Sequence, residues 1–126
     1  MSDVAQALTK VLGRGSAHEG AHHWRAQRLT AIALLLLGTW FVIALARLPD
    51  YGYTAVHAWA SGLWNATLLA LFTAAACWHS LLGVQVVIED YVRGWLRPAA
   101  LVVSAFIHVL LGVGGVLAVV RLALGS

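Results

Sequence analysis

The sequence predicts an all-α integral membrane protein with three transmembrane helices and its N-terminus on the inner side of the membrane. Of its 126 residues, 61% are hydrophobic and 10% are charged, and the mean hydropathy is +0.83. Soluble domains are about 45–50% apolar and about 25% charged. The charged residues also gather between long apolar runs, as they do at the ends of membrane helices. A chain of this length has room for one bundle and no second domain.

Residues 1–24 are expected to form a cytoplasmic N-terminal segment. Apolar residues recur there with helical spacing, which predicts a short helix on the membrane surface, at Val4, Leu8, Val11 and Leu12. Small residues then predict a flexible connector, at Gly13, Gly15, Ser16 and Gly20. The segment carries charges and no apolar core of signal-peptide length, which argues against a cleaved secretory signal.

Residues 25–124 are predicted to form a three-helix membrane anchor, since about 20 residues at 1.5 Å rise cross a bilayer core of ~30 Å. The first uncharged run has 18 residues between Arg28 and Arg47 and predicts a helix at about 26–47. Asp50 and Glu89 enclose 38 uncharged residues, too many for one span. Their aromatic-rich beginning is interpreted as interfacial, with the second helix at about 60–87. A third run of 23 residues from Pro98 predicts a helix at about 97–122.

The positive charges predict the orientation of these spans. Six lie on the N-terminal side and in the loop at 88–97, namely Lys10, Arg14, Arg25, Arg28, Arg93 and Arg97. Two, Arg47 and Arg121, lie on the other side, so the N-terminus is expected inside. This placement accounts for the net charge of +3, so the expected surroundings are the lipid bilayer and no nucleic acid. The single cysteine, Cys77, cannot build a disulfide or a Cys-based metal site from this chain alone.

Two histidines in mid-helix, His79 and His108, are the first candidates for chemistry because an ionisable side chain in lipid is costly. Small residues surround each of them. The helix face beside His79 carries small residues, Ala75, Ala76 and Gly83, so a flat haem could approach there. Two alternatives stay open from the residues alone: a haem held by both histidines, or neutral imidazoles bonded to other helices in a bundle that small residues pack closely.

The exit of the second helix carries a carboxylate and a phenol, Asp90 and Tyr91, at the membrane boundary. Such groups can hydrogen-bond and protonate a lipophilic quinone, although residue chemistry alone favours an ordinary wetted loop. Arg28 could pair with a haem propionate or snorkel to a lipid phosphate. His18, His22 and His23 match no zinc spacing and are interpreted as solvated or as contacts to a soluble partner.

The stretch HSLLGVQVVIEDYV, residues 79–92, resembles the second-helix signature of the hydrophobic membrane-anchor subunits of succinate dehydrogenase, which are b-type cytochrome anchors. That pattern is a histidine, a nearby glycine and an Asp-Tyr pair at the helix exit. The stretch HHWRAQRLTAIAL, residues 22–34, is similar to the family's entry into its first helix. With the three-span layout, the resemblance covers most of the chain.

The resemblance implies a complex of four chains, complex II, in electron transport and the tricarboxylic acid cycle. A flavoprotein subunit oxidises succinate, an iron–sulfur subunit passes electrons to ubiquinone, and this subunit catalyses no succinate chemistry itself. It further implies that His79 is an axial ligand of a b-type haem shared with a second three-helix membrane-anchor subunit. Tyr91 would donate to a quinone carbonyl with Asp90 in the proton path, and Arg28 would lie near the haem propionates and the quinone.

Two other functions are compatible with the residues. The first is a free-standing b cytochrome that uses His79 and His108, and the second is a cofactor-free structural or transport membrane protein. A bacterial inner membrane is the expected location, since the N-terminus lacks an Arg- and Ser-rich transit segment.

Overall fold

A computed structural model describes the backbone of residues 2–125 and the side chains of residues 20–125. Within that range the chain forms four helices and no strand: α1 (Ser2–Ala46), α2 (Tyr53–Ser61), α3 (Leu63–Tyr91) and α4 (Leu96–Leu124). Three segments are long and apolar enough to cross a membrane, Gly20–Ala46, Leu63–Tyr91 and Leu96–Leu124. The predicted all-α architecture with three candidate spans is confirmed.

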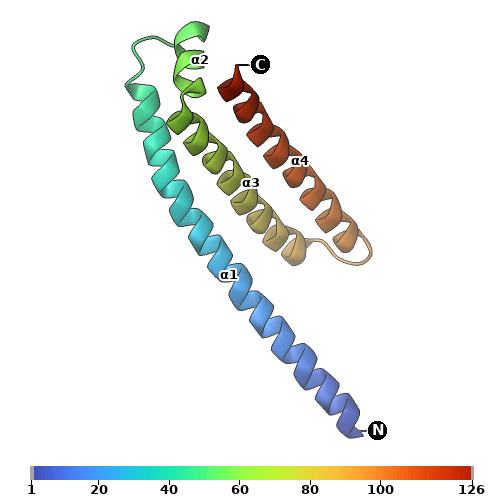
Figure 1. The fold of residues 1–126 in the computed structure, drawn as a ribbon. Helices are drawn as coiled ribbons and strands as arrows, with labels where there is room; N and C mark the ends of the chain where they lie inside the picture. Colours follow the sequence, from blue (N-terminus) through green and yellow to red (C-terminus); the bar gives the residue numbers. More distant parts are fainter. Residues whose placement is uncertain (1, 126) are drawn as a thin grey trace.

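The long helices lie in a row with α3 in the middle (Figure 1). Helix α3 packs against α1 on one flank and α4 on the other, while α1 and α4 make no contact within the described backbone. Among the described side chains very few are buried, namely Thr30, Ala60, Ala66, Leu82 and Ser104. An open row of this kind encloses almost no core, so lipid or other protein must cover its apolar faces.

The N-terminal segment differs from the expected short helix and connector. Helix α1 runs unbroken from Ser2 through Gly13, Gly15 and Gly20 and reaches beyond the ends of α3 and α4 (Figure 1). Glycine weakens a helix by about 1 kcal/mol but removes no backbone hydrogen bond, whereas proline does. The first proline is Pro49, so nothing before it forces a break. The side chains of residues 2–19, which include His18, lie outside the described range.

The aromatic lead-in to the second span forms a separate short helix, α2, that the sequence did not predict. Gly62 has extended backbone torsions (φ −60°, ψ 135°), so α3 begins at Leu63 instead of about residue 60. The Asn65 side-chain amide donates to the Trp59 carbonyl across this break at 2.8 Å. Trp59 also stacks on Trp40 with ring centroids 6.1 Å apart. These contacts tie α2 to both α1 and α3.

The turn after α3 is shorter than expected, because α3 continues to Tyr91 and α4 starts at Leu96. Gly94 has a positive φ of 68°, a conformation that other residues adopt at a cost. The Arg97 guanidinium donates to the Glu89 carbonyl at 2.7 Å and so satisfies one of the free carbonyls at the end of α3. Glu89, Asp90 and Tyr91 therefore occupy the last helical turn.

The packing of α4 on α3 leads to a first prediction, at Gly115. A Cβ placed there would lie 2.6 Å from the Cγ2 atom of Thr73, whose rotamer is held by its hydroxyl bond to the Leu69 carbonyl. Gly115→Ala is therefore expected to lower the free energy of unfolding by about 1–3 kcal/mol, measured by thermal denaturation of the detergent-purified protein.

Gly114 provides the matched control for that substitution. A Cβ on Gly114 meets nothing within 4 Å, so Gly114→Ala should be neutral or slightly stabilising. Equal stability of the Gly115→Ala and Gly114→Ala proteins would show that α3 and α4 do not pack as described.

Candidate functional site

The site is centred on a contact between His79 of α3 and Thr30 of α1. The Thr30 Oγ1 atom lies 2.9 Å from the His79 Nδ1 atom, and Thr30 is only 5% exposed. The Thr30 hydroxyl also donates to the Ala26 carbonyl at 2.8 Å. With its proton directed there, Oγ1 accepts a hydrogen bond from Nδ1–H. This assignment leaves the other ring nitrogen, Nε2, with a free lone pair, the form in which histidine ligates a metal.

The Nε2 atom of His79 makes no hydrogen bond to any side chain or backbone group of residues 20–125. The ring is also only partly buried. A ligand that approaches this nitrogen therefore displaces no existing bond.

His108 of α4 is bonded through both ring nitrogens. Its Nδ1 atom lies 2.8 Å from the Ser104 carbonyl, and its Nε2 atom lies 3.0 Å from the Ser80 Oγ atom on α3. Nδ1–H donates to the carbonyl, and Nε2 accepts from the Ser80 hydroxyl. Both ring nitrogens of His108 are thus hydrogen-bonded, and the side chain connects α4 to α3.

The two histidines consequently lie at different helix interfaces. His79 contacts α1, whereas His108 contacts α3 from the α4 side, and α1 and α4 lie on opposite flanks of α3. The sequence left these histidines equivalent in depth and surroundings, and the structure separates them. A haem held by both within this one chain is not favoured by this arrangement.

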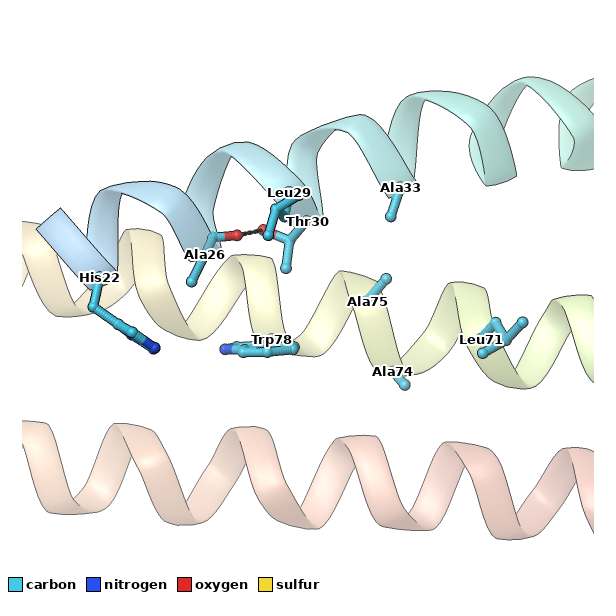
Figure 2. Close-up of a pocket in the computed structure, with 9 residues that line it drawn as sticks. All are labelled: His22, Ala26, Leu29, Thr30, Ala33, Leu71, Ala74, Ala75 and Trp78. Carbon is cyan, nitrogen blue, oxygen red and sulfur yellow. Dashed lines mark hydrogen bonds between the residues drawn. The ribbon is translucent and has the colours of Figure 1, made fainter.

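A cavity of about 490 Å³ lies between α1 and α3, beside Thr30 (Figure 2). Its volume falls in the range of about 300–1,000 Å³ that ligand pockets occupy. The walls are mostly small or apolar, and the lining residues are His22, Ala26, Leu29, Thr30, Ala33, Leu71, Ala74, Ala75 and Trp78. Figure 2 shows the imidazole of His22 and the indole of Trp78 directed toward one another. The cavity is thus an apolar slot with a few polar groups.

The small residues around His79 border open space between α1 and α3. Ala75 lines the cavity beside Thr30, but His79 itself is not among the lining residues. A Cβ on Gly83 would lie 3.7 Å from the Gln27 Nε2 atom, an ordinary van der Waals contact, so helix packing does not require glycine there. Gly83 and Gln27 also line a second cavity of about 460 Å³.

Asp90 and Tyr91 lie in the last turn of α3, where both side chains are exposed, Tyr91 to 81%. Asp90 follows His79 by 11 residues. That interval is about three helical turns and about 16 Å along the axis, so Asp90 shares the face of His79. Neither side chain is hydrogen-bonded within the described residues. Both are thus available to a ligand or a partner chain at the end of the helix.

Arg28 does not approach His79. It is exposed, and its guanidinium carbon lies 5.3 Å from the centre of the Trp24 ring. Thr30, two residues later, is buried against α3, and two residues correspond to about 200° around a helix. Arg28 therefore lies on the outer face of α1, away from the contact with α3.

The side chains that the structure describes, those of residues 20–125, include His22 and His23 but not His18. No group of three metal-ligating side chains exists among those residues. His22 lines the cavity, and His23 is half-buried, with no partner for its Nε2 atom within the same range. Sequence reasoning missed the cavity-facing role of His22 and the role of Thr30. Their signal was the four-residue interval of His22, Ala26 and Thr30, which places them on one helix face.

Comparisons with family models and with curated proteins point to the same family. The family model of the succinate dehydrogenase/fumarate reductase transmembrane subunit matches residues 2–119. The chain is 34% identical over 115 residues to the succinate dehydrogenase hydrophobic membrane anchor subunit of Paracoccus denitrificans, covering 90% of this chain and 88% of that protein. It is 31% identical over 91 residues to the protein of the same name from Rickettsia conorii, covering 71% and 72%.

Proposed function

Since this chain belongs to the succinate dehydrogenase/fumarate reductase transmembrane subunit family, as a membrane-anchor subunit, we propose that it ligates a b-type haem through His79 and forms part of a ubiquinone site with Tyr91 and Asp90. Membership also makes it a multi-pass membrane protein that works in a complex with other subunits.

The observation that carries the haem proposal is the bonding state of His79. Its Nδ1 atom lies 2.9 Å from the Thr30 Oγ1 atom, and its Nε2 atom is free of hydrogen bonds within the described residues. An imidazole held in this way suits an iron ligand. The apolar cavity between α1 and α3, which Thr30 lines and His79 does not, offers space nearby for an apolar group. A haem with two histidine ligands supplies one-electron transfer and no oxygen activation.

The second axial ligand is proposed to come from the companion membrane-anchor subunit. His108 is the other mid-helix histidine that the sequence singled out, and both of its ring nitrogens are already bonded. The open row of helices leaves broad apolar faces for such a companion to cover. This supports the shared haem over a free-standing cytochrome.

The quinone site is proposed at the end of α3. Tyr91 would donate a hydrogen bond to a quinone carbonyl, and Asp90 would pass protons from the water phase. Their exposure in the last helical turn supports this, because a site completed by partner chains needs side chains that its own subunit leaves uncovered. Arg28, on the outer face of α1, would meet a propionate or quinone only at the boundary with a neighbouring subunit.

The proposed partners are the companion membrane-anchor subunit, the iron–sulfur subunit and the flavoprotein subunit. The distribution of positive charge predicts that the N-terminus and the turn after α3 face the inner side, where the soluble subunits would bind. The relatives from Paracoccus and Rickettsia support a location in a bacterial inner membrane.

Purification of the complex through a tag on this chain tests the proposal. The flavin and iron–sulfur subunits are expected to co-purify, and the reduced-minus-oxidised spectrum is expected to show a b-type haem that succinate reduces. A coloured chain that purifies alone would identify a free-standing cytochrome instead. An intact complex without haem absorbance would refute the proposed haem ligation but not the role of the chain as a membrane anchor.

A further inference from the structure

We propose that Thr30 is a positioning residue for the haem ligand, which holds His79 in the tautomer and orientation that leave Nε2 free for iron. This inference rests on the proposed ligation by His79. It assigns to Thr30 an effect on how tightly haem is held and on the reduction potential of the haem, exerted through His79.

The geometry around Thr30 supports this role. Its hydroxyl is the one group within the described residues that bonds to the His79 ring, with Oγ1 2.9 Å from Nδ1. Thr30 is 5% exposed and lies inside the first candidate span, so its hydroxyl is largely shielded from water. An unpaired Nδ1–H in such surroundings would be costly. The Thr30 hydroxyl therefore selects the protonated Nδ1.

The hydroxyl can accept from His79 because its own proton has other acceptors. Oγ1 donates to the Ala26 carbonyl at 2.8 Å and lies 3.1 Å from the Gln27 carbonyl. The result is a chain of bonds from the His79 ring through Thr30 to the backbone of α1.

The chemistry of the acceptor predicts the direction of the effect on potential. An acceptor at Nδ1–H increases the electron donation of the imidazole to the metal, which stabilises the ferric state over the ferrous state. Removal of the hydroxyl should therefore weaken the binding of ferric haem more than that of ferrous haem and so raise the reduction potential. If the affinity for ferric haem falls tenfold more than the affinity for ferrous haem, the potential rises by about 59 mV for one electron.

The test compares Thr30 variants in the whole purified complex. Thr30→Val keeps the shape of the side chain and removes the acceptor, so haem affinity should fall roughly 10- to 100-fold, as is typical when the bonding partner of a metal-ligating histidine is lost. The potential of the remaining haem should rise, and the electron paramagnetic resonance signal of the ferric haem should shift. Thr30→Ser restores the hydroxyl and should behave as the wild type.

Thr39 on the same helix is the matched control. Its hydroxyl also donates to the carbonyl four residues earlier, that of Leu35, at 2.6 Å, but no histidine among residues 20–125 bonds to it. Thr39→Val should leave haem content and potential unchanged. If Thr30→Val does not assemble, Thr30→Ala is measured in its place, since it also removes the acceptor.

The outcomes separate this inference from the proposed function. A wild-type potential and ferric signal in Thr30→Val or Thr30→Ala, in a complex whose haem is lost with His79→Ala, would overturn the role of Thr30 alone. Full haem retention in His79→Ala would overturn the ligation itself. Equal changes in Thr30→Val and Thr39→Val would mean a general packing effect and would also overturn the role of Thr30.

Discussion

Replacement of His79 by alanine is expected to abolish the haem absorbance of the purified complex. The Nε2 atom of His79 makes no hydrogen bond within the described residues, and a methyl side chain cannot ligate iron. A haem left with one protein ligand also loses the closed low-spin site that two histidines provide. The measurement is the reduced-minus-oxidised spectrum per mole of flavin, so that loss of haem is not confused with loss of complex.

His108→Ala is the matched control for His79→Ala. The substitution removes a bond between α4 and α3, the contact of Nε2 with the Ser80 hydroxyl at 3.0 Å. Hydrogen bonds between membrane helices contribute about 0.6 kcal/mol on average, so the complex should be slightly less stable and keep its haem. Haem loss in His108→Ala with retention in His79→Ala would refute the assignment of the ligand.

Tyr91→Phe is expected to lower the rate of ubiquinone reduction by succinate about tenfold or more. The phenol is 81% exposed at the end of α3, and we propose that it donates to a quinone carbonyl. Loss of one donor to a buried acceptor costs about 1–3 kcal/mol, and about 1.4 kcal/mol corresponds to a factor of ten. Succinate oxidation with an artificial acceptor should stay unchanged, because that assay does not use the quinone site.

Tyr53→Phe is the control for the quinone experiment. Tyr53 is 82% exposed at the start of α2, at the end of the bundle away from Tyr91 (Figure 1). Its loss should affect neither assay. Equal decreases in both assays for Tyr91→Phe would place the defect in assembly, and an unchanged quinone rate would remove Tyr91 from the site.

The number of long helices could be predicted from the amino-acid sequence. Charged residues are excluded from lipid, so the three uncharged runs had to be spans. The structure keeps these three spans. It differs at the end of the second span, because Asp90 and Tyr91 were expected in the loop at 88–97 and lie instead in the last turn of α3. The N-terminal helix differs, because glycines permit a break without requiring one.

Only the packing of the helices shows that His79 has a ring nitrogen available to a ligand and that His108 does not. His79 and His108 have similar local surroundings, and their difference comes from what the neighbouring helices place beside them, Thr30 in one case and Ser80 in the other. Those contacts depend on the rotation and register of α1 and α4 against α3. In helices that are apolar on nearly every face, no hydrophobic stripe specifies that register. It follows from side-chain packing and hydrogen bonds between residues that are distant in the sequence.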